Sequence, residues 1–187
     1  LNKQRSDLGL PTNKRIILIV AKGGISNPWK GGNHAQEVIN AFKSDPRAFF
    51  IDFGGNPDQA NPQLKTMGYM ADFDTLAKYY SAADMLLYPS IADNCPLVVL
   101  EAMACGLPVV SFDTGGIPEL IDHKINGYVA KYKNMGDLIT GVEYLLTLSP
   151  QKTEEMNQYS INKIKNGFTV EKMADQYLEI YHQILNR

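Results

Sequence analysis

The stretch that decides the fold class is MLLYPSIADNCPLVVLEAMACGLPVVSFD, residues 85–113. It begins and ends with short apolar runs. Between them, a polar loop leads into a longer apolar segment with Pro96 near its start and Gly106 at its end. Proline is favoured in the first turn of a helix and glycine directly after the last turn. The pattern therefore predicts a strand, a helix and a second strand, the unit from which parallel sheets are built.

The same alternation continues on both sides of this stretch. Further runs typical of buried strands are RIILIVA (15–21), AFFIDFGG (48–55), LKTMGYM (64–70) and GYVA (127–130). Segments that fit helices between them are HAQEVINAFKSD (34–45), DFDTLAKYYSAAD (72–84) and GGIPELID (115–122). Strands that alternate with helices predict an α/β fold. We expect a Rossmann-like, doubly wound parallel sheet of about six strands with helices on both faces.

Three more helical segments close the chain, at residues 134–149, 150–168 and 169–186. The middle one is the most polar, and we expect it to lie on the outside. The last one has apolar side chains along one stripe: Val170, Met173, Tyr177, Ile180, Tyr181 and Ile184. Such a stripe predicts that this helix is buried against another surface.

Composition excludes several classes of protein. The chain has 187 residues, which fits one domain, with 44% hydrophobic and 20% charged residues and a net charge of -2. Its lysines are scattered rather than gathered in a basic stripe, which argues against binding to nucleic acid. No uncharged run is long enough to cross a bilayer. The two cysteines, Cys95 and Cys105, match no zinc or disulfide pattern, so we expect two buried thiols in a reducing cytoplasm.

Ligands of open parallel sheets bind at the carboxyl ends of the strands, so the loops there carry the candidate site. The loop after the first strand contains Lys22, Gly23, Gly24 and Lys30. Glycines let backbone amides approach a ligand closely, and two lysines suggest an anion such as phosphate. The loop matches neither the dinucleotide fingerprint nor a P-loop. A glycine-rich surface loop with solvated lysines is an equally good interpretation.

Glu101 is the one charge in the apolar segment after the fourth strand. An unpaired buried carboxylate is costly, so it must reach water, a cation or ligand hydroxyls. The alternative is an edge position from which the carboxylate reaches solvent. Asp93 and Asn94 stand just before this helix, and for Asp93 alone a helix cap is the simpler interpretation. With no His, Asp and Glu cluster at ligand spacing, we expect no metal.

Residues 79–130 resemble the C-terminal half of the group 1 glycosyltransferases, retaining enzymes of family 4 with a GT-B fold. The family signature is a carboxylate, seven intervening residues and a glutamate, and Asp93 and Glu101 have this spacing. Most members have Glu at the first position, so Asp93 keeps the charge on a shorter side chain. EAMACGLPVV, GGIPELI, NGYVA and WKGG also fit the family.

The resemblance implies a role for each candidate. Glu101 would bind the ribose hydroxyls of a nucleotide sugar, and Asp93 would contact hydroxyls of the donor sugar. The backbone amides of Leu97 and Val98 would hold the diphosphate, and Lys30 would neutralise it as it leaves. The remaining donor-binding candidates are Lys22, where the family usually has an arginine, together with Gly23, Gly24 and Asn94.

The resemblance also implies a domain organisation. Residues 1–14 would be a linker from an N-terminal acceptor domain outside this chain, because the polar start LNKQRSDLGLPTNKR lacks both an initiating Met and a signal peptide. Residues 15–168 would form the Rossmann-like nucleotide-sugar-binding domain. Residues 169–187 would form a helix that crosses toward the missing domain. Its stripe, with Tyr177 and Tyr181, would pack either on that partner or on its own domain.

The expected activity is a metal-independent transfer of the hexosyltransferase type, with no cofactor. It would move sugar from a nucleotide-sugar donor to a glycan or lipid-linked acceptor. The enzyme would be cytoplasmic, with peripheral association at the inner face of the membrane, and the isolated chain would be inactive. Two alternatives stay open: a GT-B-like sugar-nucleotide epimerase and a degenerate scaffold domain without catalysis.

Overall fold

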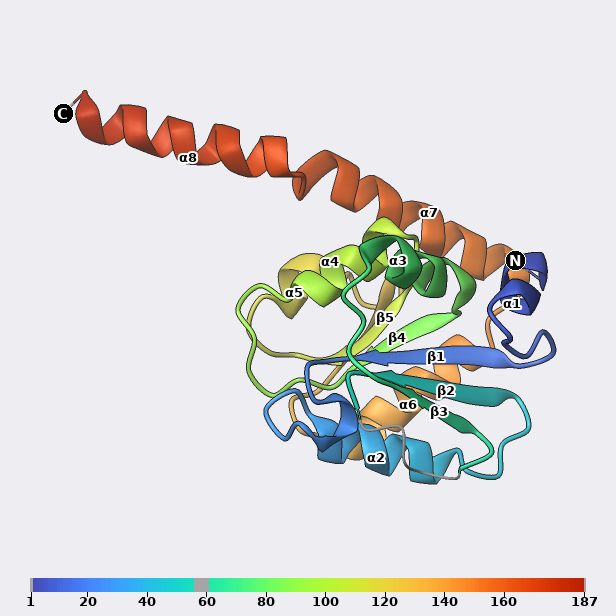
Figure 1. The fold of residues 1–187 in the computed structure, drawn as a ribbon. Coiled ribbons are helices and arrows are strands. Elements are labelled where there is room, and N and C mark those ends of the chain that lie inside the picture. The colour runs from blue at the N-terminus through green and yellow to red at the C-terminus, as the bar shows by residue number, and fades with distance from the viewer. Residues whose placement is uncertain (1, 56–60, 187) are drawn as a thin grey trace.

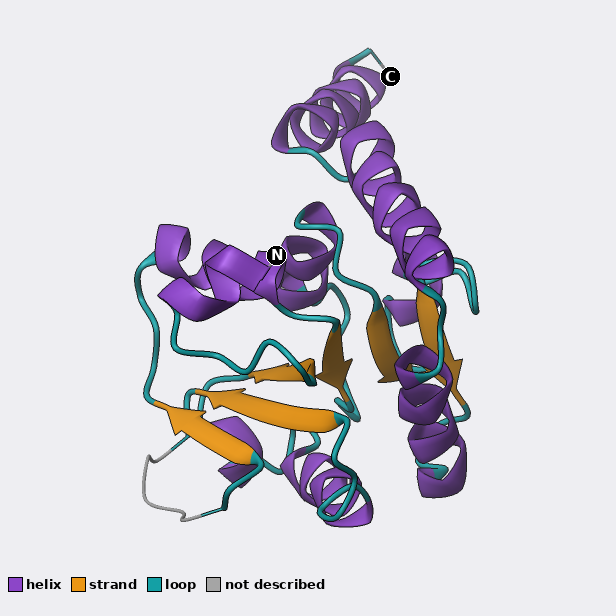
Figure 2. Ribbon diagram, turned by 90° about the vertical axis from the view of Figure 1, so that its right-hand side faces the viewer, coloured by secondary structure: helices purple, strands orange, loops and turns teal. Residues whose placement is uncertain are grey.

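The computed structural model describes residues 2–55 and 61–186. In these ranges the chain forms one parallel sheet of six strands in the order β3-β2-β1-β4-β5-β6 (Figures 1 and 2). The strands are β1 (Arg15–Val20), β2 (Ala48–Phe53), β3 (Leu64–Met67), β4 (Met85–Tyr88), β5 (Val109–Phe112) and β6 (Gly127–Ala130). All pairings are parallel, and β1 lies between β2 and β4. The predicted fold class is therefore confirmed.

Helices cover both faces of this sheet (Figure 2). They are α1 (Asn2–Asp7), α2 (Gly32–Ala41), α3 (Phe73–Ala82), α4 (Leu97–Ala104), α5 (Ile117–Leu120), α6 (Met135–Leu146), α7 (Pro150–Gly167) and α8 (Val170–Leu185). A short 3₁₀ helix, η1, spans Gly24–Ser26. Helices α3, α4 and α5 pack on one face, and α2 and α6 pack on the other (Figure 1).

The apolar strands explain why both faces need a cover. In β1, Ile16 and Leu18 belong to the core on the α3–α4 side, whereas Ile17 and Ile19 belong to the core on the α2–α6 side. Successive side chains of a strand point to opposite faces, so a continuous apolar run is stable only between two helical layers. Helix α3 begins directly after Asp72, whose side chain caps it by accepting a hydrogen bond from the Thr75 amide.

The polar N-terminal stretch differs from the expected linker. Helix α1 lies beside α3, and Arg5 is only 3% exposed. The Arg5 guanidinium donates to the Asp84 carboxylate at 2.6 Å and to the Ala82 carbonyl at 2.8 Å. Leu10 is buried in the core. The N-terminal stretch is thus held on the domain by Arg5 and Leu10, and the buried, hydrogen-bonded arginine takes the place of the apolar stripe that a docked helix usually shows. Connection to a preceding domain stays a prediction.

The last two helices behave differently from each other. Helix α7 lies against α4 and buries Met156, Ser160 and Ile164, so a narrow stripe of this polar helix is inside while the rest is outside as expected. Helix α8 extends away from the sheet (Figure 1), and every one of its residues is exposed. Its apolar stripe therefore does not pack on its own domain. Crossing toward another domain stays a prediction.

The cysteines correct a further expectation. Cys95 is exposed, because it lies in the loop before α4 rather than inside the helix, and Cys105 is half-buried at the end of α4. Among the residues that the structure describes, no helix combines the length and the apolarity needed to cross a bilayer.

Candidate functional site

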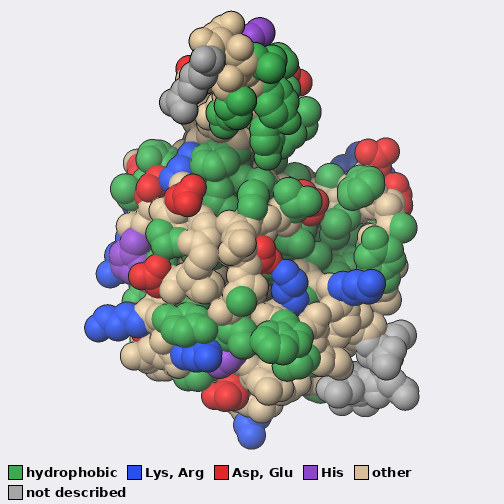
Figure 3. Space-filling model, turned by 90° about the vertical axis from the view of Figure 1, so that its left-hand side faces the viewer, with side chains coloured by type: hydrophobic (Ala, Val, Ile, Leu, Met, Phe, Trp, Pro, Cys, Tyr) green, Lys and Arg blue, Asp and Glu red, His purple; other side chains and the backbone are tan. Residues whose placement is uncertain are grey.

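The loops that follow β1, β4 and β5 interlock at the carboxyl edge of the sheet, the face seen in Figure 3. Gly31 has a φ of +75°, and a Cβ there would lie 1.8 Å from the Pro89 carbonyl oxygen. Gly115 has a φ of +52°, and a Cβ there would lie 1.9 Å from the Asp93 carbonyl oxygen. Only glycine allows such backbone conformations and such close approach together. These glycines therefore bring the three loops into direct contact.

Lys30, Tyr88 and Asp93 form the first cluster at this edge. The Lys30 Nζ lies 2.6 Å from the Asp93 Oδ2, and the Tyr88 hydroxyl donates to the same oxygen at 2.5 Å. Burial alone would raise the pKa of Asp93, but the hydrogen bonds from Lys30 and Tyr88 and the charge of Lys30 outweigh it, so this pKa lies below its ordinary value. Asp93 is therefore an ionised partner of Lys30. It is not the cap of α4, whose N-cap residue is Pro96.

Glu101 and Tyr80 form the second cluster. Glu101 is half-buried on α4, and the Tyr80 hydroxyl on α3 donates to its Oε2 at 3.1 Å. Burial, followed by the negative charge of Glu101, raises the pKa of Tyr80 well above its ordinary value. The phenol thus stays protonated and donates to the carboxylate. Glu101 keeps a second oxygen for other partners.

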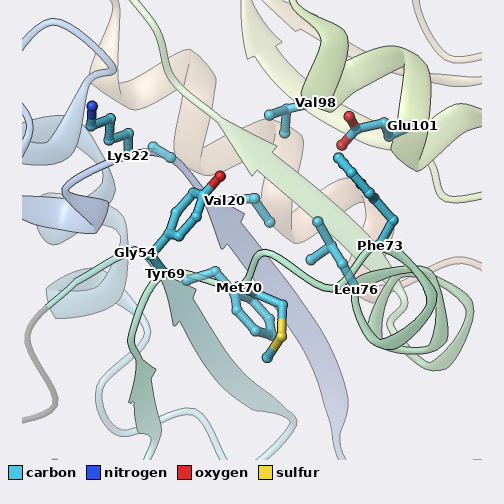
Figure 4. Close-up of a pocket in the computed structure, with 11 residues that line it drawn as sticks. Val20, Lys22, Gly54, Tyr69, Met70, Phe73, Leu76, Val98 and Glu101 are labelled. Carbon is cyan, nitrogen blue, oxygen red and sulfur yellow. The ribbon is translucent and has the colours of Figure 1, made fainter.

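A hollow of about 170 Å³ opens beside Glu101 (Figure 4). Its lining is mostly apolar: Val20, Ala21, Lys22, Phe53, Gly54, Tyr69, Met70, Phe73, Leu76, Val98 and Glu101. Tyr69 and Phe73 are 78% and 77% exposed. Lys22 and Glu101 lie on opposite sides of the hollow. A flat, largely apolar group with a polar end fits such a lining.

The N-terminus of α4 connects the two clusters. Asp93 stands just before this helix, and Val98, its second residue, lines the hollow. The first amides of a helix have no intrahelical acceptor, and the helix dipole makes this end positive. With Lys30 nearby, the end of α4 is suited to an anion that lies between Asp93 and Glu101.

The Asp52 side chain packs against the glycine-rich loop that follows β1. It is fully buried in β2, and its Oδ2 accepts a hydrogen bond from the Ile25 amide at 3.3 Å. A Cβ on Gly24 would lie 2.6 Å from both carboxyl oxygens, so the loop can rest on Asp52 only with glycine at this position. Burial raises the pKa of Asp52.

The family to which the chain belongs follows from a comparison that covers most of its sequence. The sequence model of the glycosyl transferases group 1 matches residues 2–163. The chain belongs to the group 1 glycosyltransferases. A protein of Methanocaldococcus jannaschii described as an uncharacterized glycosyltransferase is 42% identical over 190 residues, 95% of this chain and 47% of that protein. The N-acetyl-alpha-D-glucosaminyl L-malate synthase of Bacillus anthracis is 32% identical over 200 residues, 99% of this chain and 50% of that protein.

The fold of this group 1 glycosyltransferase chain is also found in solved structures. Anabaena HepE in complex with UDP-glucose matches with a TM-score of 0.78 at 22% identity, over 97% of this chain and 52% of that one. The chain spans about half the length of each of these three proteins.

The structure brings part of the predicted site of this glycosyltransferase chain together. Lys30 meets Asp93, whereas Lys22, Val98 and Glu101 line the hollow. Of the remaining predicted residues, Asn94 lines a separate shallow depression with Asp93, the Leu97 side chain is exposed, and Gly23 directly precedes η1 as its N-cap residue. Gly24 serves the packing on Asp52.

Sequence reasoning missed Tyr80, Tyr88, Asp52, Tyr69 and Phe73. Asp52 left a signal, because it is a lone carboxyl inside an apolar strand. Tyr80 and Tyr88 fit the apolar patterns of α3 and β4, although a buried phenol usually needs a hydrogen-bond partner.

Proposed function

We propose that this chain is the donor-binding half of a retaining GT-B glycosyltransferase of family 4, which transfers a hexosyl group from a nucleotide sugar. The observation that carries the proposal is the placement of two anchored carboxylates, Asp93 and Glu101, on either side of the N-terminus of α4, with Lys30 against Asp93. Family membership favours this activity over the epimerase and the scaffold.

Each part of the donor has a matching part of the site. The diphosphate binds the amides of Leu97 and Val98 and the Lys30 ammonium. The ribose hydroxyls bind Glu101, and the nucleobase enters the apolar hollow beside it. The donor sugar lies toward Asp93, whose shorter carboxylate is held in place by the bonds from Lys30 and Tyr88 to its Oδ2.

The proposed chemistry follows from these positions. The bond between the anomeric carbon and the phosphate oxygen breaks, an acceptor hydroxyl oxygen bonds to the same carbon from the same face, and the hydroxyl proton passes to a diphosphate oxygen. The electron pair of the broken bond, and with it the negative charge, stays on the departing diphosphate. Lys30 and the positive end of α4 are fixed in place and stabilise this charge most strongly in the transition state. The mechanism that we propose uses neither a metal nor a cofactor.

The acceptor would come from a part of the enzyme outside this chain, which spans about half of its relatives. We propose a glycan or lipid-linked acceptor, bound by an N-terminal domain toward which α8 crosses. The whole enzyme would work in the cytoplasm, peripherally attached to the inner face of the membrane. The isolated chain would bind the donor and transfer nothing.

Calorimetry tests the proposal directly. The chain is titrated with UDP, GDP and ADP and with their glucose and N-acetylglucosamine conjugates. We expect one nucleotide to bind, and Glu101→Gln to weaken its binding by about 1.5–3 kcal/mol, the range of a hydrogen bond to a charged group. If none of these compounds binds at millimolar concentration, the donor site does not exist.

A further inference from the structure

Tyr80 is placed to control how Glu101 meets a ligand. The ring lies in the core on α3 and is 2% exposed, yet its hydroxyl reaches the Glu101 Oε2 at the edge of the hollow. Helix α3 lies beside α4, so the phenol approaches the carboxylate from the protein side. The hydrogen bond therefore takes Oε2 and leaves Oε1 as the oxygen available to a ligand.

This contact answers a physical difficulty of the site. A glutamate on a half-exposed helix face has several rotamers, and a ligand that selects one of them loses affinity to the ordering of the side chain. A rigid phenol that is already buried orders the carboxylate before the ligand arrives. The difference between an ordered and a mobile carboxylate then appears in affinity for the group that the carboxylate binds.

We propose that Tyr80 is a positioning residue for ribose recognition: its hydroxyl fixes the Glu101 carboxylate so that Oε1 meets the ribose hydroxyls of the donor. The inference rests on the proposed function, since it assigns the ribose to Glu101. It goes further because the ribose is then recognised by two side chains acting together, Glu101 on α4 and Tyr80 on α3. Tyr80 itself need not touch the nucleotide.

The test compares Tyr80→Phe with a matched control, Tyr79→Phe. Tyr79 is the preceding residue of α3, is also buried, and packs its ring edge-to-face on Phe53. Both changes remove one hydroxyl and keep the ring. Each variant is titrated with UDP, or with GDP or ADP where that binds the wild type more tightly, and with the 2′,3′-dideoxy form of the same nucleotide.

We expect Tyr80→Phe to weaken binding of the ribonucleotide about three- to tenfold, up to the lower end of the range for a hydrogen bond to a charged group, and to leave dideoxynucleotide binding unchanged. Tyr79→Phe should change neither. Because Tyr80 acts through Glu101, Tyr80→Phe combined with Glu101→Gln should bind no more weakly than Glu101→Gln alone.

Other outcomes overturn the inference. The inference is wrong if Tyr80→Phe binds the ribonucleotide as tightly as the wild type does. It is also wrong if Tyr80→Phe loses equal affinity for the ribonucleotide and the dideoxynucleotide, which would show a general effect on the fold. Tyr80→Met provides a second route if Tyr80→Phe does not fold, because it also removes the hydroxyl while it keeps an apolar side chain in the core, and it should give the same selective loss. If the wild type binds no nucleotide, the proposed function fails as well. If the wild type binds and only the Tyr80 effect is absent, the inference alone fails.

Discussion

At the scale of single residues, the Lys30–Asp93 pair determines how charge is arranged at the site. A lysine on a glycine-rich loop would ordinarily move through many rotamers, and fixing it costs conformational entropy. Here the Asp93 Oδ2 holds the ammonium from one side. An ammonium has three donor protons, so Lys30 can keep this bond and still donate to a phosphate. The pair therefore places the cation before the donor binds.

Replacing Lys30 tests this arrangement. Lys30→Met keeps most of the apolar stem and removes the charge, so we expect nucleoside diphosphate affinity to fall about ten- to hundredfold, the equivalent of one hydrogen bond to a charged group. Binding of the nucleoside without phosphates should not change. Lys43→Met is the control, because Lys43 is an exposed lysine that follows the C-terminal end of α2 and has no proposed role at the site. Calorimetry measures both variants. Equal losses in the two would contradict a special role for Lys30.

Residues of this site differ in how far the sequence reveals them. Lys30 and Glu101 break the pattern of their surroundings, one in a glycine-rich loop and the other in an apolar helix, so composition alone draws attention to them. Tyr80 and Tyr88 fit the apolar pattern of their elements. Their function depends on the direction of a hydroxyl, which is set by the packing of α3 against α4 and by the loop after β4. Neither of these is a local property of the sequence.

At the scale of elements, the spacing of apolar residues and the positions of Gly and Pro predict the strands and the larger helices. They do not predict α1. Residues 2–7 contain no apolar stripe, and a polar segment before the first strand is typical of a linker. What docks α1 is Arg5, held by Asp84, which also accepts hydrogen bonds from Arg15 and from the Ile16 amide. One side chain from each of two distant segments decides the position of this helix, and no local pattern contains that information.

The Asp84 network makes a prediction about stability. Asp84→Ala leaves the Arg5 guanidinium buried without its carboxylate, and we expect a loss of about 3–5 kcal/mol in the free energy of unfolding. Glu143→Ala is the control, since the Arg47–Glu143 pair is exposed on both sides and such pairs contribute about 0–1 kcal/mol. Urea denaturation measures both. A loss below about 1 kcal/mol for Asp84→Ala would show that α1 is not anchored through this ion pair.

At the scale of the whole molecule, the chain divides into a closed domain that ends with α7 and a helix that adds nothing to its core. Figure 3 shows apolar side chains along one side of the helix that stands above the carboxyl edge. Apolar residues of α8 that are more than half exposed include Val170, Tyr177, Tyr181 and Leu185. Contiguous apolar surface of this kind is unusual on a monomer and is typical of a surface that another body covers.

Removal of residues 169–187 tests this division. Because no residue of α8 is buried, the shortened chain loses no core contact, and we expect its thermal midpoint and free energy of unfolding to equal those of the full chain. The contrasting deletion begins at residue 150 and also removes α7, whose Met156 and Ile164 are buried. Burying a side chain of this size contributes about 1.5–3 kcal/mol, so the second deletion should destabilise the domain strongly. Circular dichroism during heating measures both.

The first deletion should also reduce concentration-dependent association in light scattering, since it removes the exposed stripe. A lower midpoint for the chain that ends at residue 168 would mean that α8 packs on the domain in solution, and the surface it presents would then not be free for another part of the enzyme.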